Sequence, residues 1–137
     1  MQAFIEKIKQ TPLFSINKAC PPQDIADHLI LLQTLEFSPP PLEYLKFIQE
    51  INGVRTFNAC IYGCYKKSDT NLIDFLDKNL LLDREDKKYI IALGENTMDY
   101  LVYNKNENQY ETRDLSSDQV TYTFDTLKDA LSYFLDI

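Results

Sequence analysis

The sequence predicts an α+β fold, in which a mainly antiparallel sheet of about 4–6 strands is packed by N-terminal helices and a C-terminal helix. Changes in the hydrophobic spacing indicate this order. Apolar residues recur with the helical period up to residue 51 and with a period close to two between residues 57 and 124. The helical period returns after residue 125. Short polar turns separate the predicted strands, as is typical of an antiparallel meander.

Length and composition indicate one globular domain over residues 1–137. The chain has 137 residues, of which 45% are hydrophobic and 26% charged, close to the average of folded proteins. A chain of this length can bury a sizeable core. The composition excludes a disordered tail, a collagen-like chain and a disulfide-dense miniprotein.

Three helices are expected before residue 54. The first lies in an N-terminal helical extension, residues 1–20, and ends before Pro12. The second opens at Pro21 and Pro22, because proline is tolerated in the first turn of a helix. Its apolar stripe consists of Ile25, Leu29, Leu32 and Leu35. The third ends at Asn52-Gly53, where glycine suits the left-handed position that follows a helix. Its buried face, with the i, i+3, i+4, i+7 spacing, consists of Tyr44, Phe47, Ile48 and Ile51.

The predicted sheet begins with one or two short strands around residues 57–62, in which Phe57, Ala59 and Ile61 share one face. Residues 66–87 form a polar connection with a short helix near Phe75. Further strands are expected over 88–93, 98–103, 109–113 and 120–124, with Gly94-Glu95-Asn96 as a turn. Asp125 or Thr126 caps the last helix. Its apolar stripe consists of Leu127, Leu131, Phe134 and Leu135.

The N-terminus and the cysteines favour a cytoplasmic protein. The first ten residues contain no long apolar segment of the kind found in secretory signals. Apolar runs stay far below the roughly 18 residues of a membrane span. The three cysteines are an odd number, and Cys60 and Cys64 would lie about 13 Å apart on a strand, too far for a disulfide. We therefore expect reduced thiols.

The sequence favours neither an enzyme nor a metal or cofactor site. The only histidine, His28, lies inside a predicted helix, where a surface or partly buried role is the simpler interpretation. Zinc could in principle use Cys20, His28, Cys60 and Cys64, but the C-x₃-C and C-x₇-H spacings differ from those of zinc motifs, so we expect ordinary buried thiols. The three glycines are scattered and form no phosphate-binding loop.

Charge and tyrosine content are more informative. The net charge of −7 disfavours direct binding to nucleic acid. The run Asp83, Glu85 and Asp86, interleaved with basic residues, is typical of a solvated loop. Most of the nine tyrosines lie in or beside predicted strands. Cross-strand packing explains many of them, and a tyrosine-lined protein interface is the functional alternative.

The segment Pro41-Leu42-Glu43-Tyr44-Leu45-Lys46-Phe47-Ile48-Gln49-Glu50-Ile51-Asn52-Gly53 resembles the signature of the SUKH superfamily, in which a proline and a Tyr-x-x-Phe helix precede Asn-Gly. Ile61-Tyr62-Gly63 resembles the strand and turn that follow, and Ile90–Gly94 with Asp99–Tyr103 resembles the central hairpin. The resemblance extends from about residue 22 to 137, and the small YrhA-like bacterial branch is the most similar. Many members carry Gly-Gly before the aspartate equivalent to Asp99, where this chain has Thr97-Met98.

The resemblance implies a non-enzymatic protein. Bacterial members are commonly immunity proteins that bind a cognate polymorphic toxin inside the producing cell, and eukaryotic relatives include regulators of cell-wall assembly. It also implies a structural role for the motif residues Pro41, Tyr44, Phe47, Asn52 and Gly53.

We therefore expect a protein partner, in particular a toxin domain with a basic, nuclease-like surface toward which an acidic inhibitor would be steered. The chain itself would be a monomer or a weak dimer. The candidate contact residues are Asp83, Glu85, Asp86, Glu95, Asp99, Tyr100 and Tyr103. The alternative is a regulatory or scaffolding protein that binds an endogenous enzyme or a cell-wall assembly factor.

Overall fold

Seven strands form one antiparallel sheet in which each strand pairs with the next along the chain. The computed structural model describes residues 1–64 and 73–137. The strands are β1 (Ser15–Ile16), β2 (Val54–Arg55), β3 (Ala59–Ile61), β4 (Ile90–Asn96), β5 (Asp99–Asn104), β6 (Gln109–Asp114) and β7 (Val120–Phe124). The helices are α1 (Gln2–Gln10), α2 (Pro22–Thr34), α3 (Leu42–Ile48), α4 (Phe75–Leu82) and α5 (Leu127–Leu135). The α+β class and the antiparallel meander are thereby confirmed.

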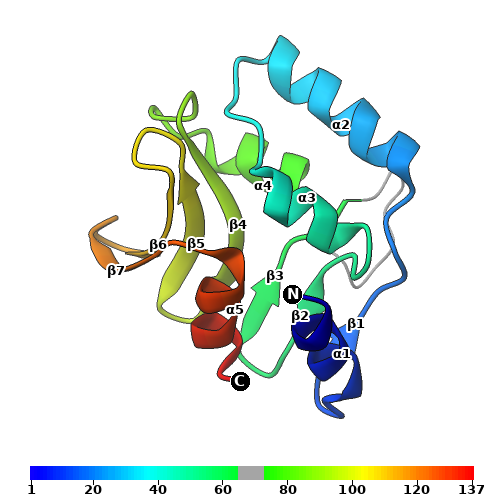
Figure 1. Ribbon diagram of the computed structural model, residues 1–137. Coiled ribbons are helices and arrows are strands. Elements are labelled where there is room, and N and C mark those ends of the chain that lie inside the picture. Colours follow the sequence, from blue (N-terminus) through cyan, green and yellow to red (C-terminus); the bar gives the residue numbers. More distant parts are fainter. Residues whose placement is uncertain (65–72) are drawn as a thin grey trace.

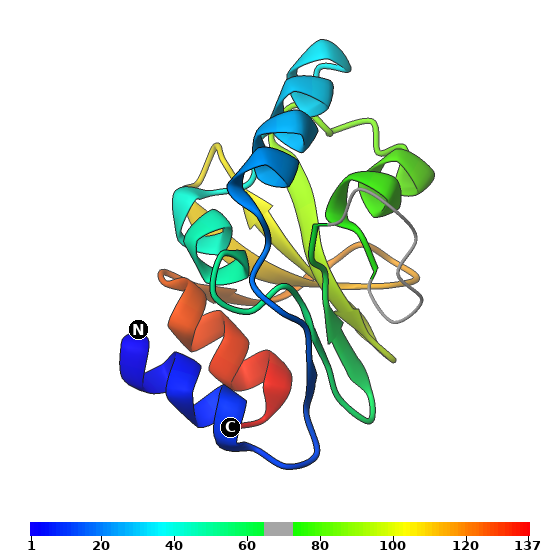
Figure 2. The same ribbon diagram turned by 90° about the vertical axis from the view of Figure 1, so that its right-hand side faces the viewer.

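Helices cover both faces of the sheet (Figures 1 and 2). Helix α3 reaches one face through Tyr110, whose hydroxyl donates to Glu43 at 3.2 Å. Helix α5 packs on the same face, where Tyr133 meets Phe124 of β7. Helix α4 lies on the opposite face, and Lys78 pairs there with Glu95 of β4 at 2.9 Å. Helix α2 lies above α3 in both views, over the start of α4.

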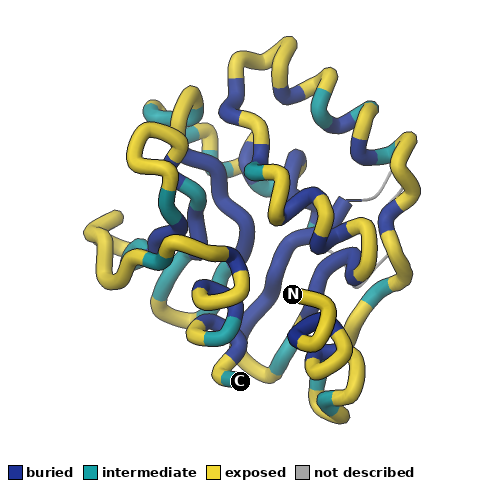
Figure 3. The backbone as a smooth tube through the Cα atoms, in the orientation of Figure 1, coloured by how far each residue is buried: buried dark blue, intermediate teal, exposed yellow. Residues whose placement is uncertain are grey.

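The core follows the hydrophobic spacing of the helices. All four residues of the predicted α3 face are at most 1% exposed, and the predicted apolar residues of α1 and α5 are buried as well. The middle of the sheet is buried on both sides, whereas β7 and the outer side of α2 are exposed (Figure 3). Leu35 is 41% exposed, because α2 ends at Thr34 and the chain turns away, so its predicted place in the apolar stripe is wrong.

Residues 1–20 are more than a helical extension. Ser15 and Ile16 pair with Arg55 and Val54 and add the outermost strand of the sheet, so the strand count exceeds the expected 4–6. Strand β1 has only two residues, both exposed, and therefore lacks the alternation that identifies a strand. The N-terminal segment also contributes Phe4, Ile5 and Ile8 to the core.

Two predicted details of the sheet are wrong. Phe57 lies in the turn between β2 and β3 and is fully exposed, so it does not share a strand face with Ala59. Residues 94–96 belong to β4 instead of forming a turn. The turn of the β4–β5 hairpin follows Asn96, whose Oδ1 accepts hydrogen bonds from the backbone N–H groups of Met98 and Asp99. The pairing of β4 with β5 shifts register between Ala92 and Gly94, not at the Thr97-Met98 pair.

Residues 66–72 of the predicted polar connection lie outside the described residues. No helix in the described part of the chain combines the length and the apolar character needed to span a bilayer.

Gly94 of β4 lies directly against the backbone of β3, and we predict that Gly94→Ala destabilises the fold. A Cβ atom there would be 2.8 Å from the Cys60 carbonyl oxygen and 3.0 Å from Ile61 Cδ1. Because the nearer atom is backbone, the strands must move apart, and the free energy of unfolding should fall by about 1–3 kcal/mol. Urea denaturation measures this. Thr97→Ala in the exposed turn is the control, and an equal, small effect of both changes would contradict the close approach.

Candidate functional site

The motif residues Tyr44 and Asn52 hold the chain where it leaves β3. The Tyr44 hydroxyl donates to the Tyr62 carbonyl at 2.6 Å. The Asn52 side chain makes two bonds to Cys64, accepting from its N–H and donating to its carbonyl, both at 2.7 Å. Tyr44 and Asn52 are at most 7% exposed. Their side chains supply hydrogen bonds to backbone groups that would otherwise be buried without partners.

The other motif residues shape the helix that carries Tyr44. Pro41 precedes α3, and its carbonyl accepts from the N–H groups of Tyr44 and Leu45. Phe47 is 1% exposed and belongs to the core. Gly53 has φ 91°, a left-handed conformation that favours glycine and that turns the chain from α3 into β2.

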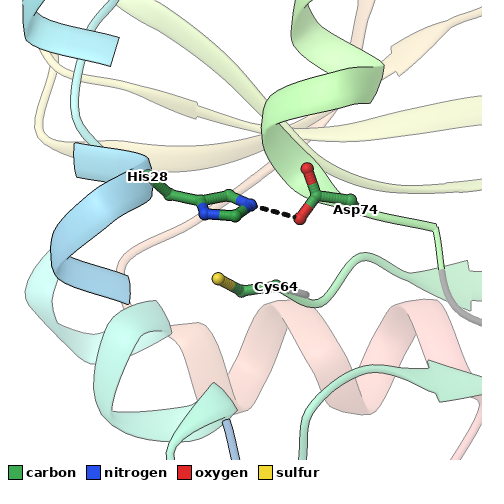
Figure 4. A group of neighbouring side chains, drawn as sticks. All are labelled: His28, Cys64 and Asp74. Carbon is green, nitrogen blue, oxygen red and sulfur yellow. Dashed lines mark hydrogen bonds and ion pairs between the residues drawn. The ribbon is translucent and has the colours of Figure 1, made fainter. Parts of the chain in front are cut away.

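The placement of Cys64 creates a buried cluster with His28 of α2 and Asp74 at the start of α4 (Figure 4). His28 Nε2 lies 2.6 Å from Asp74 Oδ1. The other Asp74 oxygen caps α4 by accepting from the Asp77 N–H at 3.0 Å. One ligand atom from each of His28, Cys64 and Asp74 lies within 4.8 Å of the other two. The exposed fractions of the three residues are 7%, 0% and 2%.

The electrostatics of the cluster favour a charged imidazole. Burial alone would lower the pKa of His28, but the hydrogen bond and negative charge of Asp74 outweigh it, so the pKa is raised. The backbone of Asp24, one turn earlier on α2, also interacts favourably with the protonated ring. His28 thus joins α2 to the start of α4 through a buried ion pair. From the sequence, only a surface or partly buried histidine was expected.

A second thiol borders the cluster. Cys20 donates to the Cys64 carbonyl at 3.4 Å. The hydrogen bond between the two thiols lowers the pKa of Cys20 and raises the pKa of Cys64. Burial also acts against ionisation of both thiols. Cys60 lies apart, with its sulfur directed at the Ile61 carbonyl. All three cysteines are free and buried, as the sequence predicted.

The cluster combines the residue types of a cysteine–histidine–acid catalytic site, but the thiol is inaccessible. Cys64 has no exposed surface, and its raised pKa keeps it protonated, whereas nucleophilic attack requires an accessible thiolate. The same residue types are metal ligands. His28 and Cys64 are candidate ligands from the sequence, whereas Asp74 follows the connection after Cys64 and meets His28 only through the fold.

The charged run after α4 is less solvated than predicted. Arg84 binds both Asp86 and Asp118, and Arg113 of β6 binds Glu111 at 2.8 Å. The Arg84, Arg113 and Glu111 side chains are only 15%, 13% and 3% exposed. The prediction that Asp86 belongs to a solvated run is therefore wrong, because Arg84 binds its carboxylate. Asp83 and Glu85 are exposed. Nearby lies an open hollow of about 650 Å³, lined by Arg84, Glu85, Asp86, Tyr89 and Asp118.

The remaining candidate contact residues are spread over different parts of the sheet. Glu95 accepts from Lys78 and from the Tyr62 hydroxyl. Tyr100 is paired across the strands with Glu95 and therefore lies on the α4 side. Tyr103, at the other end of β5, stacks edge-on against Tyr110 at 5.0 Å. Glu95 and Tyr100 therefore lie on the α4 side, where Tyr100 is opposite Arg113, whereas Tyr103 lies on the other face with Tyr110.

Asp99 does belong to a coherent surface, together with Asp114, Tyr122 and Tyr133, which we call the tyrosine–aspartate surface. Asp99 and Asp114 are directly opposite each other on β5 and β6. The Tyr122 and Tyr133 rings lie 4.9 Å apart and are 55% and 46% exposed. Partial desolvation and the neighbouring Tyr122 raise the pKa of the Tyr133 phenol, and the charge of Asp99 acts in the same direction. Tyr133 was missed by the sequence analysis, although an aromatic residue outside the apolar stripe of α5 was the available signal.

The two aspartates have different surroundings but no cationic partner among the described residues. Partial burial and the neighbouring charge of Asp114 raise the pKa of Asp99. The backbone N–H groups of Ser117 and Ser116 lower the pKa of Asp114, which shapes the turn between β6 and β7. Two half-buried like charges therefore lie beside two exposed tyrosine rings.

Comparison of the chain with protein-family models, with curated proteins and with solved structures found no match in any of the three. The SUKH resemblance therefore stays a prediction.

We predict that Arg113→Met lowers the free energy of unfolding by about 3 kcal/mol, because it leaves the Glu111 carboxylate buried without its main counter-charge. The double variant Glu111→Gln/Arg113→Met removes both charges and should regain most of that loss. Urea denaturation at neutral pH distinguishes the two. If the double variant is no more stable than Arg113→Met, the ion pair does not account for the effect.

Proposed function

We propose that this protein is a non-enzymatic immunity protein that binds and neutralises a toxin domain with a basic surface, in the cytoplasm of the producing cell. The observation that carries the proposal is the tyrosine–aspartate surface, where the half-buried Asp99 and Asp114 have no cationic partner among the described residues and adjoin the exposed Tyr122 and Tyr133. The resemblance of residues 41–53 to the SUKH signature supports the immunity role.

The chemistry of this surface favours an arginine-bearing partner. An arginine placed against Asp99 and Asp114 would offset the mutual repulsion that raises the pKa of Asp99. Its planar guanidinium can also stack on an exposed tyrosine ring. Tyrosine and arginine are enriched among the residues that dominate protein–protein binding energies. The surface thus offers both a charge contact and an aromatic anchor.

The overall charge acts in the same direction. A net charge of −7 attracts a basic partner at long range and accelerates association. The same charge repels nucleic acid, so the inhibitor would compete for the phosphate-binding face of a nuclease without itself binding the substrate. Such steering affects mainly the association rate and the choice of partner.

The partner can be identified by a pull-down from the source organism, followed by mass spectrometry and co-expression. The proposal predicts capture of a toxin domain whose lethality this protein suppresses. Capture of a housekeeping enzyme, with a deletion phenotype that requires no toxin, would contradict it and support the regulatory alternative.

Once the toxin domain has been identified, we predict that Asp99→Asn/Asp114→Asn slows its association with this protein about 10-fold at low salt. The association rate should also depend less on salt concentration. Asparagine keeps the acceptor oxygen that the turn at Asp114 requires. Tyr133→Ala should mainly accelerate dissociation, because it removes an aromatic anchor. Surface plasmon resonance measures both rates.

The matched control is Asp83→Asn/Glu85→Gln, which removes the same number of charges from the exposed loop after α4. Binding of this control should stay close to that of the wild type. If it loses binding while Asp99→Asn/Asp114→Asn does not, the partner contacts the loop instead of the tyrosine–aspartate surface.

A further inference from the structure

We propose that His28, Cys64 and Asp74, with Cys20 as the fourth ligand, form a structural zinc site. The four residues come from four different segments: the loop before α2, α2 itself, the end of the β3 segment, and the start of α4. All are buried, at 7% exposure or less. Two thiols, an imidazole and a carboxylate are a donor set typical of zinc.

The separation of the donors suits a single ion. Zinc bonds of 2.0–2.3 Å place tetrahedral donors roughly 3.3–3.8 Å apart. The ligand atoms of His28, Cys64 and Asp74 lie within 4.8 Å of one another, so small side-chain rotations bring them to that distance. Figure 4 shows the Cys64 sulfur beneath the imidazole ring, and the Asp74 carboxylate directed at the ring nitrogen.

The orientation of the imidazole identifies the ligating nitrogen. Its Nε2 faces Asp74 Oδ1 at 2.6 Å, and the Asp24 backbone interacts with the protonated ring. A backbone carbonyl that holds one ring N–H is the usual outer partner of a zinc-bound histidine. Zinc would take the place of the proton that Nε2 shares with Asp74, and the two thiol protons would be released to the buffer.

Cys20 completes the coordination. Its thiol donates to the Cys64 carbonyl at 3.4 Å and therefore lies beside that residue. Rotation of the Cys20 side chain toward Cys64 Sγ brings a second sulfur to the cluster. The site is closed and has no exposed thiol, which is a feature of structural zinc rather than of catalytic zinc.

Local spacing in the sequence hides such a site. Zinc motifs are identified by ligand pairs on one turn or hairpin, whereas here every ligand lies on its own segment. Three of the four residues considered as zinc ligands from the sequence, Cys20, His28 and Cys64, lie together in the fold. Asp74 is the fourth residue of the cluster. Cys60 lies apart, with its sulfur directed at the Ile61 carbonyl.

The test is the metal content of the full-length protein. It should be produced with zinc in the medium, purified without chelator or polyhistidine tag, and kept reduced. The expected result is about one zinc per chain, and a melting temperature that falls after treatment with chelator and recovers on addition of zinc. Cobalt added to the zinc-free protein should give the visible bands of a tetrahedral ion and a thiolate charge-transfer band.

Single variants locate the site. Cys64→Ser and Cys20→Ser should each weaken zinc binding at least about 10-fold and reduce the charge-transfer band, whereas Cys60→Ser, the matched control, should bind like the wild type. The wild-type measurements need no variant to fold. The proposal is overturned if the wild type contains no zinc, shows no melting shift and gives no cobalt bands. It is also overturned if Cys60→Ser loses zinc while Cys20→Ser and Cys64→Ser retain it.

Discussion

The chain that leaves β3 separates from β4 after the hydrogen bond between the Tyr62 N–H and the Leu93 carbonyl, and beyond it two asparagine side chains make the hydrogen bonds that neighbouring strands would otherwise supply. Asn52 holds the N–H and carbonyl of Cys64, and Asn79 holds those of Ala92 at 2.9 and 3.0 Å. Both asparagines are buried, at 7% and 2% exposure. Without them, buried backbone groups on both sides of the gap would lack partners. These amides therefore attach the segment after α3 and helix α4 to the backbone beyond this point, and they fix the backbone of Cys64 near His28.

The charges of the molecule are distributed in two ways. On the α4 side, arginines and acids neutralise one another in a network that fastens the loop after α4 to β6 and to the turn before β7. On the α5 side, Asp99 and Asp114 have no such partners among the described residues. Intramolecular pairing therefore accounts for one acidic region and leaves the other available to a partner, which is why the proposed contact surface differs from most of the candidates named from the sequence.

Local spacing predicted the elements with the strongest periodicity. The buried face of α3, the stripe of α5 and the strands from β4 to β7 could all be read from the sequence, because each depends on residues close together in the chain. The turn assigned to residues 94–96 failed for a specific reason. Gly-Glu-Asn is typical of turns, but Gly94 is required by its contact with the Cys60 carbonyl on a neighbouring strand. Strand β1 was missed since an exposed two-residue edge carries no pattern. The His28–Asp74 pair and the Tyr122–Tyr133 contact join residues distant in sequence, so only the fold brings them together.

The central structural claim is that side-chain amides complete the sheet at its opening. Native-state hydrogen exchange followed by NMR tests it at the Cys64 and Ala92 amides, neither of which donates to another strand there. The hydrogen bonds to Asn52 and Asn79 predict that both amides exchange as slowly as those of Leu101 and Val102 in the buried centre of the sheet. Exchange as fast as that of Phe57 in the exposed turn between β2 and β3 would show that the asparagines do not close the sheet, and would contradict the placement of Cys64 on which the buried cluster depends.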